Sequence, residues 1–268
     1  MAARRRLDAE LVRRGLARSR EQAATLIADG RVSVAGRVAS KSASVVGGAE
    51  PIVVRQSADA DDYVSRGGHK LAGALDVFAA EGLGVTGRRC LDAGASTGGF
   101  TDVLLRRGAA EVIAVDVGYG QLAWSLRTDP RVVVLDRTNV RDLSPEVVGK
   151  AVDLVVADLS FISLRLVLGS LAGVAAPGGD LLVMVKPQFE VGRDRVGRGG
   201  VVRDPALRAE AVRSVAAAAG QVGLGVAGVT ASPLPGPSGN VEYFLWLRAG
   251  APPLDPADAG RAVQEGPA

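Results

Sequence analysis

The sequence predicts an α/β protein: a mostly parallel sheet covered by helices on both faces, preceded by a small basic α+β domain. Three observations lead to this prediction. From residue 65 onward, apolar strand-like runs alternate with helix-like runs. A Gly-rich loop at residues 92–100 joins one strand to a helix. The excess positive charge is N-terminal, because residues 1–60 contain 11 Lys and Arg against 6 Asp and Glu.

The composition is typical of a reducing, aqueous compartment. The 268 residues are 47% hydrophobic but only 4% aromatic, so the core must consist mainly of Val, Leu and Ala. A single cysteine, Cys90, excludes an internal disulfide, and with a single histidine it argues against a metal site. No apolar run approaches the ~18 residues of a membrane span. No apolar segment follows the basic residues 4–6, so we expect a cytoplasmic protein without a secretory signal or membrane partner.

Residues 1–55 are expected to form the small domain. Apolar residues at 7, 11 and 12 have helical spacing. Ser19 is a candidate N-cap for a second helix that Gly30 ends. Short strands are expected at 31–34 and 51–54.

A polar, acidic stretch at 56–64 predicts a linker, and residues 65–250 are expected to form the large domain. The tail, 251–268, is rich in Pro, Ala and Asp and is expected to be loosely ordered. Expected strands of the large domain lie at 88–91, 111–116, 131–135, 152–157, 180–185, 224–230 and 241–247. Expected helices lie at 68–80, 99–107, 121–127, 163–174 and 205–221.

The Gly-rich loop favours a particular kind of cofactor. Its glycines, at 94, 98 and 99, depart from the G-x-G-x-x-G spacing of dinucleotide sites, which makes a pyrophosphate less favoured. The leading acid, Asp92, suits a cation such as S-adenosylmethionine, which carries a sulfonium and an ammonium group but no phosphate. Asp116 ends the next strand, where an acid can hold ribose hydroxyls of either cofactor or cap a turn.

Lysine usage indicates where chemistry occurs. Only 4 of 32 basic residues are lysine: Lys41, Lys70, Lys150 and Lys186. A lysine, unlike an arginine, can lose its proton when burial or neighbouring cations lower its pKa, so a general base would retain it. For a single lysine, a surface position is the commoner explanation.

Two of these lysines and two acids are placed to converge. Lys186 and Asp158 each end an apolar strand, at the sheet edge where ligands of α/β proteins bind. Glu242 lies near the start of the last expected strand and reaches the same edge if that strand is antiparallel. Lys70 lies in the first turn of the helix before the Gly loop. Each alone could be a surface ion pair or cap, but together they predict a catalytic cluster.

Several N-terminal submotifs occur in order: Arg6-Leu7-Asp8, Arg14-Gly15-Leu16-Ala17, Gly30-Arg31-Val32 and Val34-Ala35-Gly36. In these the segment resembles the RNA-binding module named after small-ribosomal-subunit protein four. The alternative is a basic helical hairpin without RNA. The resemblance implies phosphate contacts from a group of cations: Arg4, Arg5, Arg6, Arg13, Arg14, Arg18, Arg20 and Lys41.

The loop Asp92-x-Gly-Ala-x-x-Gly-Gly-Phe100 resembles that of FtsJ-type RNA 2′-O-methyltransferases, with Thr97 where proline is common. The resemblance implies a Rossmann-like methyltransferase sheet and a catalytic Lys-Asp-Lys-Glu tetrad formed by Lys70, Asp158, Lys186 and Glu242. It also implies S-adenosylmethionine contacts from Asp92, Gly94, Ala95, Ser96, Thr97, Gly98, Gly99, Phe100, Asp116 and Asp158, and adenine contacts from Asp136 or Asn139.

With both modules present, the whole chain except its tail resembles the TlyA family, ribosomal RNA cytidine 2′-O-methyltransferases also labelled haemolysins. The resemblance implies ribosomal RNA or ribosomal subunits as partner, of the small and possibly the large subunit, and a link between loss and capreomycin resistance. Under this hypothesis, Lys186 takes the proton of a ribose 2′-hydroxyl. The rivals are an NAD-dependent oxidoreductase, which leaves the basic module unexplained, and a membrane-lytic protein. The second rival needs an amphipathic or spanning segment, and we find none that the predicted sheet does not already explain.

Overall fold

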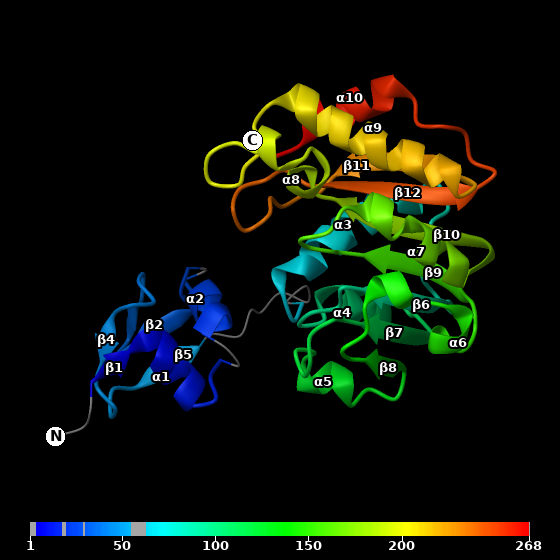
Figure 1. Ribbon diagram of the computed structural model, residues 1–268. Helices are drawn as coiled ribbons and strands as arrows, with labels where there is room; N and C mark the ends of the chain where they lie inside the picture. The colour runs from blue at the N-terminus through cyan, green and yellow to red at the C-terminus, as the bar shows by residue number, and fades with distance from the viewer. Residues whose placement is uncertain (1–3, 18–19, 29, 55–62, 268) are drawn as a thin grey trace. The chain divides into compact units, whose positions relative to one another are not determined.

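The computed structural model describes residues 4–17, 20–28, 30–54 and 63–267 and divides the chain into two compact units, 1–62 and 63–268 (Figure 1). The division falls inside the stretch expected to be a linker. Residues 56–62 of that stretch, and residue 55 before it, lie outside the described residues. Tyr63 and Val64 belong to the second unit, where the Val64 N–H donates a 3.0 Å hydrogen bond to Asp102.

The first unit is the expected small α+β domain. Its elements, in chain order, are β1 (Arg5–Arg6), α1 (Leu7–Arg13), α2 (Arg20–Ala28), β2 (Val32–Val34), β3 (Arg37–Val38), β4 (Val45–Val46) and β5 (Ile52–Val54). Strands β3-β2-β5 form an antiparallel sheet, and β1 pairs with β4. The predicted helical spacing is confirmed, because Leu7 and Leu11 are fully buried with Ile27 of α2. The predicted N-cap Ser19 lies outside the described residues.

The second unit is a seven-stranded sheet with helices on both faces (Figure 1). Its strands are β6 (Arg89–Ala93), β7 (Glu111–Val115), β8 (Val132–Leu135), β9 (Val152–Ala157), β10 (Ala175–Val185), β11 (Leu224–Ala231) and β12 (Tyr243–Ala249). Its α-helices are α3 (Arg66–Ala79), α4 (Gly99–Arg106), α5 (Trp124–Arg127), α6 (Pro145–Val148), α7 (Leu168–Val174), α8 (Pro187–Glu190), α9 (Pro205–Gln221) and α10 (Pro256–Glu265), with 3₁₀ turns η1 (Val140–Asp142), η2 (Leu164–Leu166) and η3 (Arg193–Arg195).

The strand order is β11-β12-β10-β9-β6-β7-β8, and β12 runs antiparallel to both of its neighbours. The expected antiparallel last strand is therefore confirmed, although it lies inside the sheet. Side chains alternate between two cores, as strand geometry requires. In β9, Leu154 and Val156 face a core with α3 and α4, whereas Val155 and Ala157 face a core with α7 and α9. Burial on both faces explains the continuous apolar runs.

The C-terminal segment corrects the prediction of a loosely ordered tail. Residues 256–265 form α10, which begins where the Asp255 side chain accepts a 2.8 Å hydrogen bond from the Ala257 N–H. Ala259 and Ala262, one helical turn apart, are buried in the same core as α9. The composition alone was misleading, because small residues at this spacing can pack closely although they contribute little hydrophobicity.

Candidate active site

The Gly-rich loop lies between β6 and α4, as predicted. Gly94 has φ +87°, and a Cβ atom there would lie 2.6 Å from the carbonyl oxygen of Asp158. The Asp158 N–H in turn donates a 3.0 Å hydrogen bond to the Ala93 carbonyl. Only glycine allows this close approach, which joins the cofactor loop to the end of β9.

Asp92 is fully buried beneath this loop. The Thr101 hydroxyl donates a 2.7 Å hydrogen bond to its Oδ2, while its Oδ1 is buried without a hydrogen-bond partner. Burial, together with the nearby carboxylates of Asp158 and Asp116, raises the pKa of Asp92 to about 7. A buried oxygen lacking a donor is suited to a cationic group of a ligand.

Asp116 follows β7 and lies against the same loop. Its Oδ2 accepts a 2.8 Å hydrogen bond from the Ser96 N–H, and its Oδ1 accepts one of 2.7 Å from the Gly118 N–H. The carboxylate thus caps a turn, one of its two predicted roles, and borders the Gly loop, while its binding of ribose stays a prediction.

Both residues expected near the adenine, Asp136 and Asn139, already have hydrogen-bond partners within the protein. Asn139 accepts a hydrogen bond from the Arg141 N–H and so caps η1. Asp136 accepts hydrogen bonds from the Gly120 N–H at 3.3 Å and from Arg127 at 2.9 Å. Since Gly120 follows β7, Asp136 braces the segment that begins at Asp116.

Lys186 lies at the carboxyl end of β10. Its Nζ is 2.6 Å from Oδ1 of Asp158 and donates a 3.0 Å hydrogen bond to the Ser160 hydroxyl. The lysine side chain is 10% exposed, and that of Asp158 is 23% exposed. The pair is therefore partly shielded from water but open enough for a substrate to reach.

Lys70 and Glu242 form a second pair, 172 residues apart in the sequence. The Lys70 Nζ donates a 2.5 Å hydrogen bond to Glu242 Oε2, and both side chains are buried. Gly99 allows this arrangement because a Cβ atom there would lie 2.2 Å from Ser65 Oγ and 2.8 Å from the Gly68 N. The first turn of α3, which carries Lys70, packs on the first turn of α4 at this point.

The two pairs share one edge of the sheet. In the antiparallel pairing of β10 with β12, Val185 lies opposite Tyr243, so Lys186 and Glu242 are the next residues at that edge. In β9, Ala157 pairs with Val183 of β10, and Asp158 follows it. The structure therefore brings the four charged residues to one sheet edge as two ion pairs, and their catalytic role stays a prediction. The other two lysines, Lys41 and Lys150, are exposed.

Two residues near the tetrad were not singled out by the sequence. Glu190, at the end of α8, is buried, and burial raises the pKa of its carboxyl group. Gly236 lies so close to Glu242 that a Cβ atom there would be 2.6 Å from its Oε1. A charged residue in a mostly apolar segment was the only available signal for Glu190.

The first unit uses part of its positive charge internally. Buried Asp8 pairs with Arg6 and Arg20, and buried Glu10 pairs with Arg13 and Arg14. These cations hold the pKa of both carboxyl groups well below the ordinary range.

Arg14 also donates to the backbone carbonyls of Gly47, Gly48 and Glu50, so its guanidinium is engaged within the unit. Arg4, Arg5, Arg6, Arg13, Arg20 and Lys41 are exposed, and Arg18 lies outside the described residues.

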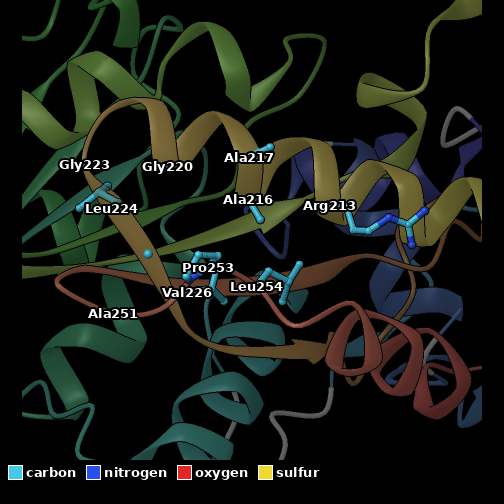
Figure 2. A pocket seen from close by; sticks show the side chains of 11 residues that line it. Arg213, Ala216, Ala217, Gly220, Gly223, Leu224, Val226, Ala251, Pro253 and Leu254 are labelled. Atoms are coloured by element: carbon cyan, nitrogen blue, oxygen red, sulfur yellow. The ribbon is translucent and has the colours of Figure 1, made fainter.

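Among the described residues, no three His, Cys, Asp or Glu side chains gather as metal ligands, and no helix is long and apolar enough to cross a membrane. A cavity of about 580 Å³ lies between the C-terminal half of α9, the start of β11 and residues 251–254 (Figure 2). It is at the amino end of β11, opposite the tetrad edge, and Arg213 is its one charged lining residue.

The sheet order, the Gly loop with its buried acid and the Lys-Asp-Lys-Glu cluster together define the class of S-adenosylmethionine-dependent methyltransferases. Within this class the chain belongs to the FtsJ-like methyltransferase family, whose sequence profile matches residues 63–249. The S4 domain profile matches residues 5–51.

Several known proteins resemble all or most of the chain. The 16S/23S rRNA (cytidine-2'-O)-methyltransferase TlyA of Mycobacterium tuberculosis is 60% identical over 273 residues, which cover 100% of both chains. Hemolysin A of Brachyspira hyodysenteriae is 36% identical over 89% of this chain and 98% of its own. A solved structure from Streptococcus thermophilus, described as a "putative hemolysin", has a TM-score of 0.77 and 36% identity over 99% of this chain and 96% of its own.

Proposed function

We propose that this protein transfers a methyl group from S-adenosylmethionine to the ribose 2′-hydroxyl of cytidine in ribosomal RNA. The observation that carries the proposal is the pair formed by Lys186 and Asp158, partly shielded and adjacent to the Gly94 loop. The full-length similarity to a 16S/23S rRNA cytidine methyltransferase supports the substrate. Ribosomal RNA as substrate implies action in the cytoplasm.

The residues around the Gly loop fit S-adenosylmethionine. This cosubstrate supplies an electrophilic methyl group on a sulfonium centre. Asp92 would face positive charge of the ligand, because its Oδ1 is buried without a donor. Asp116 would hold the ribose hydroxyls and exchange its present backbone donors for them. The loop backbone from Gly94 to Phe100 would form the remaining wall, and Asp136 would border the adenine through the segment that it braces.

Lys186 is the proposed general base. A ribose hydroxyl is a poor nucleophile and must lose its proton as it attacks the methyl group. Asp158 and Ser160 each contact Lys186 Nζ and so fix its direction. Only the neutral amine can take the hydroxyl proton, so Lys186 must first release a proton to water before the hydroxyl attacks. Holding the hydroxyl and the methyl group in line can supply about 7–11 kcal/mol of the barrier.

Lys70 and Glu242 are proposed to shape the field at the same edge. Glu242 neutralises Lys70 through the buried 2.5 Å contact, so the pair adds little net charge beside Lys186. Because Lys70 and Glu242 neutralise each other, the pair can orient neighbouring groups without itself binding the substrate.

The first unit is proposed to bind RNA. The exposed cations Arg4, Arg6, Arg20 and Lys41 are suited to phosphate contacts, and Arg18 remains a candidate. Asp8 pairs with Arg6 and Arg20, and both arginine side chains remain exposed in these ion pairs. Arg14 is left out of this set because its acceptors are intramolecular.

The proposal is tested by incubating the protein with labelled S-adenosylmethionine and with small or large ribosomal subunits from cells that lack it. Nucleoside digestion should yield labelled 2′-O-methylcytidine. Label on a base, or absence of transfer to both subunits, would contradict the proposal.

A further inference from the structure

We propose that Glu190 is a positioning residue that fixes the Lys186–Asp158 pair by tying together the two segments that carry it. The inference rests on the roles proposed above for Lys186 and Asp158. It concerns a residue that does not contact the reacting atoms and acts only through its hydrogen bonds.

The loop after β9 holds both groups that contact the lysine. Asp158 and Ser160 approach Lys186 Nζ at 2.6 and 3.0 Å, and they are only two residues apart. A shift of this loop would therefore move both contacts at once. The position of the lysine head depends on how the loop is anchored.

One end of the loop is anchored by the sheet, where the Asp158 N–H donates to the Ala93 carbonyl. The other end is anchored by Glu190. The Ser163 hydroxyl donates a 2.6 Å hydrogen bond to Glu190 Oε2, and the Leu164 N–H donates one of 2.8 Å to Oε1. Arg165 adds an ion pair at 3.3 Å.

Glu190 and Lys186 belong to the same short segment of the chain. Lys186 precedes Pro187, which opens α8, and Glu190 is the last residue of that single helical turn. The Phe189 N–H donates to the Lys186 carbonyl, so the turn is closed on the lysine. Glu190 thus connects the backbone of the lysine with the end of the loop that holds the lysine's head.

The loop needs such an anchor because its conformation is unfavourable. Phe161, between Ser160 and Ser163, has φ +64°, a left-handed conformation that a bulky residue rarely adopts. Phe161 is 92% exposed although its ring centroid lies 5.4 Å from that of Phe189, so burial of the ring does not hold the backbone there. Strain of this kind persists only where surrounding contacts over-determine it, and the bonds to Glu190 are such contacts.

The test compares Glu190→Ala, Glu190→Gln and Ser163→Ala, with Glu111→Ala as control. Glu111 pairs with Arg89 at the start of β7, the opposite end of the sheet. Glu190→Ala should lower kcat about 10- to 100-fold, as small misplacements of catalytic groups do, while the Kd for S-adenosylmethionine changes less than about threefold. Glu190→Gln keeps one acceptor and should retain activity within about threefold, because a hydrogen bond to the glutamine amide can replace one to the carboxylate.

Equal kcat for Glu190→Ala and the wild type would overturn the inference, as would a loss confined to S-adenosylmethionine affinity. If Glu190→Ala does not fold, Ser163→Ala decides: a lower kcat at unchanged Tm supports the inference, and an unchanged kcat overturns it. A parallel measurement on Lys186→Ala distinguishes failure of the proposed general base from failure of the proposed role of Glu190. Activity retained in Lys186→Ala contradicts the proposed base, whereas an inactive Lys186→Ala beside a fully active Glu190→Ala contradicts only the role of Glu190.

Discussion

Lys70 donates a 2.5 Å hydrogen bond to Glu242, and both side chains are buried although 172 residues separate them. The contact connects the first helix of the large unit with the segment that precedes its last strand. It is therefore both part of the proposed site and a tertiary link whose loss can be measured.

Replacing one partner should destabilise the fold, because an unpaired buried charge is costly. Lys70→Met alone or Glu242→Met alone should lower the free energy of unfolding by about 3–5 kcal/mol. The double variant should recover much of that loss yet remain inactive in methyl transfer. Urea unfolding and a methyl-transfer assay on the same three proteins measure both quantities. Single variants as stable as the wild type would show that the pair is not buried as described.

Asp92 should make stability depend on pH. Its pKa is raised to about 7 in the folded protein, above the ordinary value, so between about pH 4 and pH 7 the folded state holds a proton that the unfolded state has lost. The stability of the unliganded wild type relative to Asp92→Asn should therefore fall as pH rises through this window, by at most about 1.4 kcal/mol per unit. Thermal or urea unfolding of both proteins at several pH values measures the difference, and parallel curves would contradict the assignment.

The same residue should make cofactor binding depend on pH in the opposite sense. A cation beside Asp92 favours the ionised carboxylate, so the wild type should bind S-adenosylmethionine more tightly as pH rises from 5.5 to 7. Binding by Asp92→Asn should be weaker and nearly independent of pH in this range. Isothermal titration calorimetry measures both, and equal pH dependence in the two proteins would exclude Asp92 from the cofactor site.

Gly94→Ala should damage the cofactor loop. The added Cβ would lie 2.6 Å from the Asp158 carbonyl oxygen, and the backbone has φ +87°, so we expect weakened S-adenosylmethionine binding and loss of activity. Gly82→Ala is the matched control: φ is +98° but no atom lies within 4 Å of the new Cβ. Both substitutions should cost about 1–3 kcal/mol of stability from backbone strain, but only Gly94→Ala should impair binding. Equal binding by the two variants would contradict the close approach.

Gly236→Ala tests the position of Glu242. Its Cβ would lie 2.6 Å from Glu242 Oε1 and should displace that carboxylate from Lys70. We expect reduced kcat with S-adenosylmethionine affinity unchanged, whereas Ser238→Ala, an exposed position in the same loop, should be neutral. Unchanged kcat in Gly236→Ala would show that the placement of Glu242 does not limit the reaction.

The sequence alone was sufficient to place the site residues that lie at the ends of strands. Lys186 and Asp158 could be placed because apolar runs locate buried strands, and parallel strands bring their carboxyl ends to one edge. Glu242 required only the further assumption that its strand is antiparallel, and the pairing of β10 with β12 has that direction.

The sequence was insufficient wherever a role depends on tertiary contacts. Asn139 caps η1, a local hydrogen bond that no periodicity indicates. Arg14 resembles any other cation of the first unit until its carbonyl partners are known. Glu190 and Gly236 matter because of what they touch, and α10 depends on α9 for its buried face. Residue type and spacing do not identify these contact partners.

Lys186 is the residue proposed to deprotonate a ribose 2′-hydroxyl of ribosomal RNA. The most direct measurement is single-turnover transfer from labelled S-adenosylmethionine to ribosomal subunits by the wild type and by Lys186→Arg, with the product analysed as 2′-O-methylcytidine. Arginine keeps the positive charge but cannot give up its proton, so the rate should fall about 10²- to 10⁴-fold while both substrates still bind. A rate within a fewfold of the wild type would contradict the account.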